Sequence, residues 1–253
     1  MESYFYEAFE DLSRLAPGSD SSTSKVATLV KKSTNNMKIL DIGCGNGVHT
    51  LLLADLYPNA RIIAVDTHQP YIDELLCRVE RLGLEERIQV HNQSMLALDF
   101  PHEYFDLIWA EGSIYIIGFQ QGLSEWKALL KPGGQLVCSE ISWLHSSPSS
   151  ASRSFWEEGY PEINTVANKV SQITENGYEY CFSYVLPYED WTEHYYEPLA
   201  RKLDEMTELY IDVPEALEVI GMIQMEIELF HDHPNDYSYV FYGMQKMKKK
   251  AVN

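Results

Sequence analysis

The sequence predicts an α/β fold built on a doubly wound, mostly parallel sheet. Short apolar runs alternate with stretches of helical spacing from residue 38 onward, which is the pattern of successive strand and helix units. The first run, Lys38–Ile42, breaks into a glycine-rich turn, and a helical stretch begins directly after it at Val48. A strand, a glycine turn and a helix in this order form the nucleotide-binding unit of a doubly wound sheet. We therefore expect a ligand site at the carboxyl end of the first strand.

We expect two helices in residues 1–34, ahead of that strand. Apolar residues repeat at helical spacing over 4–12, and the Pro-Gly turn that follows ends this helix. A second helix is expected over 23–32. This segment either covers an edge of the sheet or closes over the ligand through its turn, Tyr6 or Arg14.

The remaining strands are predicted from apolar runs bounded by turn residues. With 253 residues and 45% hydrophobic content, the chain can bury one core, so we expect a single domain, 1–253, with elaborations. Strands are expected at 62–65, 88–91, 104–112, 135–141, 178–186 and 237–244, with helices at 48–56, 69–82, 118–130 and in the segment up to 176.

The glycine turn and two acidic residues indicate which ligand is bound. The glycines Gly43, Gly45 and Gly47 follow the spacing Gly-x-Gly-x-Gly, which differs from the Gly-x-Gly-x-x-Gly fingerprint of dinucleotide sites. Asp41 beside the turn would repel a pyrophosphate and attract a cationic ligand. Asp66 follows Asp41 by 25 residues, near the distance at which an acid reaches ribose hydroxyls. A ligand with a ribose and a positive charge fits S-adenosylmethionine, whereas NAD does not fit.

The motif at 40–47 resembles the glycine motif of the class I S-adenosylmethionine-dependent methyltransferases, and the Leu-Lys-Pro-Gly-Gly turn at 130–134 is a second match. The resemblance covers residues 36–142. It implies a seven-stranded sheet with an antiparallel last strand and S-adenosyl-L-methionine as the cofactor. Where the family commonly has an acid for the adenine amino group, this chain has Ser94. The cofactor-binding residues that we expect are Asp41, Gly43, Cys44, Gly45, Asn46, Gly47, Asp66, Thr67, Ser94, Met95 and Glu111.

Methyl transfer from a sulfonium needs little beyond positioning of the acceptor, and enzymes differ in the base that takes the acceptor's proton. Glu111 ends the fourth strand at the ligand edge and is the first candidate for a catalytic carboxylate; the alternative is that it caps a helix or meets the cofactor through its backbone. Tyr115 and His194 are the other catalytic candidates. The pair His231-x-His233 lacks a third ligand, so no metal is expected.

Residues 187–236 form a 50-residue connection where the resembled family has a short one. We expect it to be a helical cap over the acceptor pocket that determines substrate choice. Trp191 and Tyr195 are four residues apart and would share one face of a helix. The alternative is that this face packs into the core, because aromatic stripes usually indicate burial.

Charge and composition limit the classes of partner that we expect. A formal net charge of −19 disfavours nucleic acid and anionic membranes. Four scattered cysteines and the lack of a signal-peptide pattern predict a cytoplasmic protein. The fourth strand lacks the Asn/Asp-Pro-Pro-aromatic motif of amino-group methyltransferases, so a small-molecule acceptor is expected, in a branch similar to the quinone C-methyltransferases. A catalytically silent cofactor-binding protein and an NAD-dependent Rossmann oxidoreductase are the alternatives. The sequence does not predict an oligomeric state.

Overall fold

The structure is a computed structural model that describes residues 1–31 and 36–248. It contains one central sheet with strand order β3-β2-β1-β4-β5-β8-β7. The end of the second predicted helix, at residue 32, lies outside the described residues. The strands are β1 Lys38–Ile42, β2 Arg61–Asp66, β3 Ile88–Asn92, β4 Phe105–Ala110, β5 Leu130–Trp143, β6 Asn164–Thr165, β7 Tyr178–Val185 and β8 Tyr237–Lys246.

The directions of the strands agree with the prediction, but the number of strands differs from it. Strand β8 runs antiparallel to both β5 and β7, as expected for the last strand. The sheet has eight strands rather than seven, because the two-residue strand β6 pairs with Ser142 and Trp143 of β5. A two-residue strand has no readable periodicity. Strand β5 also begins five residues early, at Leu130, so the expected turn at 131–134 lies within an irregular strand.

Helices cover both faces of the sheet, and alternate strand residues point to opposite sides. In β1, Ile39 belongs to one apolar cluster and Leu40 to the other. The helices in chain order are α1 Glu2–Phe9, α2 Asp20–Leu29, α3 Val48–Leu56, α4 Gln69–Leu82, the 3-10 turn η1 Ile114–Ile116, α5 Phe119–Trp126, α6 Ser150–Gly159, α7 Val166–Glu175, α8 Tyr188–Trp191, the π-helical turn η2 Thr192–Tyr196, α9 Glu197–Leu209 and α10 Pro214–Asp232.

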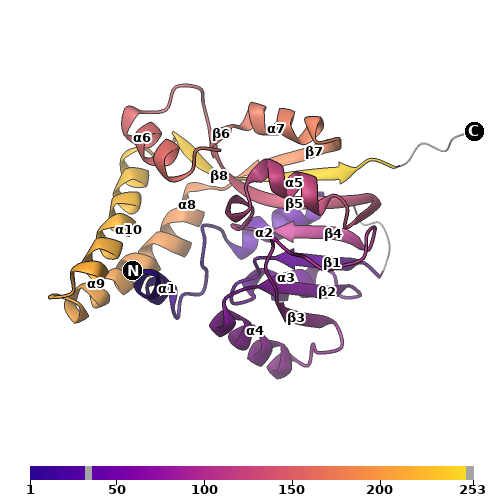
Figure 1. Ribbon diagram of the computed structural model, residues 1–253, viewed down its shortest axis with the longest axis horizontal. Helices are drawn as coiled ribbons and strands as arrows, with labels where there is room; N and C mark the ends of the chain where they lie inside the picture. Colours follow the sequence, from indigo (N-terminus) through magenta and orange to yellow (C-terminus); the bar gives the residue numbers. More distant parts are fainter. Residues whose placement is uncertain (32–35, 249–253) are drawn as a thin grey trace, which may run out of the picture.

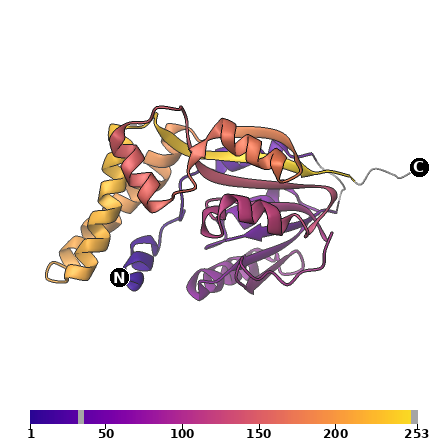
Figure 2. The same cartoon turned by 45° about the horizontal axis from the view of Figure 1, so that its top comes forward.

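The connection between β7 and β8 is helical, as predicted. Helices α9 and α10 stand beyond the carboxyl ends of the parallel strands, on the same side as α6 (Figure 1; Figure 2). Trp191 anchors this cap to β8, because its ring stacks on Tyr239 at 5.5 Å and its Nε1 donates to Ser238 Oγ at 3.0 Å. We call residues 187–236 the cap.

The N-terminal helix α1 lies between the cap and the nucleotide-binding unit rather than on a sheet edge (Figure 1). Its Tyr4 ring meets Tyr210 of the cap at 5.0 Å, and the Tyr210 hydroxyl donates to Glu7 at 2.9 Å. On the other side, Tyr6 stacks on His68 with ring centroids 4.0 Å apart. The helix therefore connects the cap with the end of β2. Among the described residues, no helix is both long enough and apolar enough to cross a bilayer.

Candidate active site

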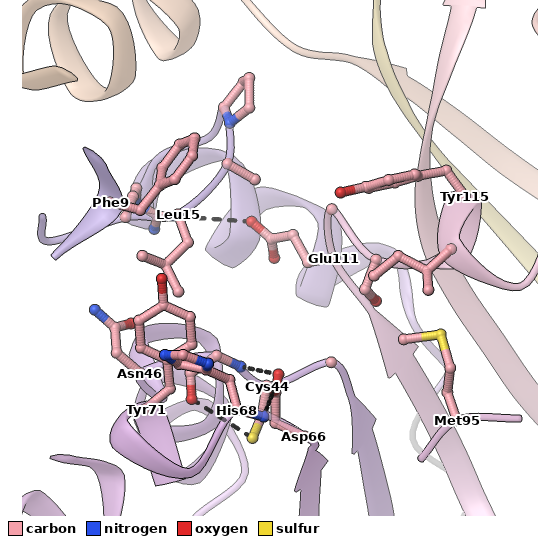
Figure 3. A pocket seen from close by; sticks show the side chains of 18 of the residues that line it. Phe9, Leu15, Cys44, Asn46, Asp66, His68, Tyr71, Met95, Glu111 and Tyr115 are labelled. Carbon is pink, nitrogen blue, oxygen red and sulfur yellow. Dashed lines mark hydrogen bonds and ion pairs between the residues drawn. The ribbon is translucent and has the colours of Figure 1, made fainter. Parts of the chain in front are cut away.

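A cavity of about 680 Å³ lies between the carboxyl ends of β1, β2 and β4 and the cap. Its volume falls within the range of roughly 300–1,000 Å³ that is usual for ligand sites. Figure 3 shows Phe9 and Leu15 of the N-terminal segment facing Met95 and Tyr115 across the open space. Side chains from the glycine turn, the N-terminal segment, α6 and the cap thus surround a single space.

The glycine turn has backbone conformations that other residues rarely adopt. Gly43 has a φ of +71°, and a Cβ there would lie 2.4 Å from Cβ of Ser113. Gly45 has a φ of +51°, and its Cβ would lie 2.8 Å from Leu15 Cδ1. Both positions line the cavity. The positive φ therefore favours glycine at both positions, and at Gly43 the close approach of Ser113 excludes a side chain as well.

Asp66 is held in a defined orientation at the end of β2. Its Oδ2 accepts the Gly45 N–H at 2.9 Å, and its Oδ1 accepts the N–H groups of Thr67 and His68 at 2.8 and 2.9 Å. Oδ1 therefore already accepts two hydrogen bonds, whereas Oδ2 accepts one and has a further lone pair. Because Asp66 lines the cavity, Oδ2 can accept a hydrogen bond from a ligand hydroxyl without reorganisation.

Asp41 lies behind the glycine turn and does not line the cavity. It is 1% exposed; Oδ2 accepts a hydrogen bond from Thr50 Oγ1 at 2.6 Å, and Oδ1 has no hydrogen-bond partner among the described residues. Burial, with the nearby charge of Asp66, raises the pKa of Asp41 to about 7 against the hydrogen bond from Thr50. A negative charge on Asp41 can therefore act on a cationic ligand only by electrostatic attraction over a distance, without direct contact.

Glu111 is at the centre of a buried network that connects the N-terminal segment to the sheet. Its carboxylate accepts hydrogen bonds from Thr23 Oγ1 at 2.9 Å and Trp109 Nε1 at 3.0 Å, and it lies 3.4 Å from Arg14 Nη1 and 3.2 Å from His49 Nδ1. Burial raises the pKa of Glu111 to about 7, although Arg14 lowers it. Burial and Arg14 lower the pKa of His49. Glu111 therefore holds Arg14 at the cavity wall, and its oxygens are already engaged.

The part of the cavity next to the cap is aromatic. Tyr115 is 42% exposed, and its ring meets that of Tyr160 at 6.2 Å; both line the cavity. From the cap, Tyr195 and Glu226 complete this wall. Burial raises the pKa of Glu226, whose Oε1 accepts the Tyr196 hydroxyl at 2.9 Å. This half of the cavity combines polarizable rings with one carboxylate.

The structure brings most of the predicted site residues together. Asp41 and Gly47 lie outside the cavity lining, the latter at the start of α3. His194 is exposed and also does not line the cavity, so the geometry gives no support to a catalytic role for it. The predicted residues that line the cavity are Gly43, Cys44, Gly45, Asn46, Asp66, Thr67, Ser94, Met95, Glu111 and Tyr115.

The two aromatic residues predicted to share a cap face have different roles. Trp191 is 1% exposed in the core, whereas Tyr195 lines the cavity. Tyr195 lies within the π-helical turn Thr192–Tyr196, and both side chains belong to the same apolar cluster.

Several lining residues were missed by sequence reasoning, including His49, His68, Tyr71 and Glu226. Glu226 lies in the middle of α10, whose charged residues are otherwise typical of a solvated face, so no sequence signal distinguishes it. Arg14 and Tyr6, given as one of two alternatives for the N-terminal segment, do line the cavity.

A family model described as "Methyltransferase domain" matches residues 39–134. The chain is 33% identical to the demethylmenaquinone methyltransferase of Symbiobacterium thermophilum over 108 residues. This aligned region covers 41% of this chain and 42% of that protein. Ribosomal RNA small subunit methyltransferase G of Chlorobium phaeobacteroides is 24% identical over 156 residues, covering 61% of this chain and 65% of that protein. An S-adenosylmethionine-dependent methyltransferase structure from Geobacter sulfurreducens, in complex with S-adenosyl-L-homocysteine, is similar with a TM-score of 0.82 at 15% identity, covering 98% of this chain and 99% of that one.

The chain spans less than half the length of the demethylmenaquinone methyltransferase that it matches. The solved structure, at 15% identity, shows the fold across nearly the whole chain. The family match lies on the strands and turns that carry the glycine motif and Asp66. The predicted fold class is thereby confirmed.

Proposed function

We propose that this chain, whose residues 39–134 belong to the methyltransferase-domain family and carry the site for S-adenosylmethionine, methylates a small-molecule acceptor. The observation that carries this proposal is that residues of the cofactor site and residues of the cap line the same cavity. Donor and acceptor can therefore occupy one continuous space.

The residues present fit the donor. The Asp66 carboxylate lines the cavity and keeps one lone pair, on Oδ2, for a ribose hydroxyl, and the backbone of Gly43 and Gly45 allows close approach of a ligand. Arg14 is buried and lines the same space, so its guanidinium can bind the donor's carboxylate. When bound, the donor supplies a methyl group activated by its sulfonium.

The acceptor half favours a small molecule. The cap and α6 close the cavity with aromatic walls, which suit an acceptor of limited size. A formal net charge of −19 repels a polyanion such as RNA, although one similar protein acts on ribosomal RNA by its name. A small, uncharged or cationic acceptor is consistent with both features.

The contribution of the protein to the reaction is chiefly positioning. Effective molarities in well-oriented reactions correspond to roughly 7–11 kcal/mol, and a sulfonium methyl group needs only a nucleophile in line with it. Because the oxygens of Glu111 are engaged by several partners, we assign it to holding Arg14 rather than to proton removal. Tyr115 faces the open space and is proposed to orient the acceptor (Figure 3).

The test is incubation of the protein with donor carrying a labelled methyl group and a panel of phenols, quinols, amines and thiols, with products identified by mass spectrometry. We expect a labelled methylated product from at least one class, and its loss in Asp66→Ala. Calorimetry with S-adenosyl-L-homocysteine and NAD accompanies the assay. Donor binding without product from any class would favour a catalytically silent binding protein, and preference for NAD would refute the proposal.

A further inference from the structure

Three carboxylates line the cavity, and they differ in how far their hydrogen-bonding capacity is used. Asp66 accepts three backbone N–H groups, and Glu111 is contacted by four side chains. Glu226 accepts a single hydrogen bond, from the Tyr196 hydroxyl to Oε1, and forms no ion pair within the described part of the chain. It is therefore the lining carboxylate with the most hydrogen-bonding capacity left for a ligand.

The surroundings of Glu226 are aromatic and come from separate elements. Tyr195 of the π-helical turn, Tyr239 of β8 and Tyr115 of η1 all line the cavity. Burial is the main cause that raises the pKa of Tyr195 and of Tyr239, and the charge of Glu226 raises both further. The negative charge of Glu226 thus acts on both Tyr195 and Tyr239.

A carboxylate in an apolar setting is unfavourable unless it is paired. Within the described residues, the cationic side chain that lines the cavity is Arg14, and it is paired with Glu111 and Asp20. The described residues that line the cavity therefore supply no free Arg or Lys side chain to pair with Glu226. A ligand cation would be such a partner, and tyrosine faces would add cation–π attraction.

We infer that Glu226 binds an ammonium group of the methyl acceptor, so the acceptor is an amine with an apolar body. The ammonium donates to the carboxylate, and the apolar body lies against the tyrosine rings. This inference deepens the proposed function and rests on it for the identity of the site. A purely structural role, fixing the Tyr196 hydroxyl in the cap, would leave the remaining oxygen of Glu226 without a function.

The experiment compares two probes of the same skeleton on protein saturated with S-adenosyl-L-homocysteine: phenethylamine, which is an ammonium at pH 7.5, and 2-phenylethanol. Binding is measured by calorimetry for the wild type, Glu226→Gln and Glu228→Gln. Glu228 is exposed on the same helix and is the matched control. Urea unfolding of each variant reports on stability.

We expect the wild type to bind the ammonium about 10- to 100-fold more tightly than the alcohol, the range for a hydrogen bond between charged groups. Glu226→Gln should remove this preference and leave alcohol binding unchanged, while Glu228→Gln should retain it. Equal binding of the two probes by the wild type would overturn the inference without requiring any variant to fold. An equal loss for both probes in Glu226→Gln would also overturn it, because that result indicates a structural role. Failure of the proposed function is distinct, since it would appear as no binding of S-adenosyl-L-homocysteine.

Discussion

The substitution Asp41→Asn tests whether a buried carboxyl group behind the glycine turn makes stability depend on pH. Asp41 is 1% exposed, and its Oδ1 has no hydrogen-bond partner among the described residues. Asparagine has nearly the same shape, and its Oδ1 can still accept the hydroxyl of Thr50. The substitution therefore removes the ionisation while retaining the packing and one hydrogen bond.

The magnitude and sign follow from the pKa. Burial raises the pKa of Asp41 from 3.8 to about 7 in the folded protein. Between these values the folded state binds more protons than the unfolded state, so this group makes stability fall as pH rises, until it is ionised in both states above pH 7. From pH 5 to pH 8.5 the loss is about 3 kcal/mol, at roughly 1.4 kcal/mol per pH unit below the folded-state pKa. The variant does not have this loss.

The measurement is the free energy of unfolding in urea from pH 5 to pH 8.5, for the wild type and the variant. The stability of Asp41→Asn relative to the wild type should rise by about 3 kcal/mol over this range. Asp99→Asn, the same change at an exposed site, should give a difference independent of pH. A flat difference for Asp41→Asn would show that this carboxylate is ionised in the folded protein throughout, which would refute the reasoning.

Two further predictions concern the cofactor and the cap. Asp66→Ala should weaken S-adenosylmethionine binding by about 1.5–3 kcal/mol, because it removes the acceptor for the ribose hydroxyls; unchanged affinity in calorimetry would contradict this role. Trp191→Ala should lower the free energy of unfolding by about 3–5 kcal/mol, since Trp191 is 1% exposed and hydrogen-bonded to Ser238, and a loss below 1 kcal/mol in urea unfolding would show that it does not anchor the cap.

The donor half of the site was predictable because its determinants are local. Gly43, Gly45 and Asp66 lie at the ends of two adjacent parallel strands, and the register of β1 with β2 brings them together. The acceptor half was less predictable because it is assembled from distant elements. Glu226 of α10 and Tyr115 of η1 line one cavity because the cap stands beyond the carboxyl ends of the strands (Figure 1), and no spacing in the sequence predicts that arrangement.

Local irregularity accounts for the other differences. The α-helix predicted around Trp191 and Tyr195 is interrupted by the π-helical turn Thr192–Tyr196, and of the two residues only Tyr195 lines the cavity. Strand β6, Asn164–Thr165, was too short to be predicted. His194, predicted as a catalytic candidate on the cap segment, is exposed, whereas the neighbouring Tyr195 is buried.

The π-helical turn Thr192–Tyr196 also has an evolutionary consequence. Its backbone hydrogen bonds join residues five apart, one more than in an α-helix, and such turns commonly occur at functional sites. Deleting one residue would restore α-helical spacing and rotate the preceding chain relative to the following chain by roughly 100° about the axis. With Trp191 fixed in the core, that rotation would direct a different side chain into the cavity. A single-codon deletion could thus change acceptor preference in one step, while the sheet and the cofactor site remained as they are.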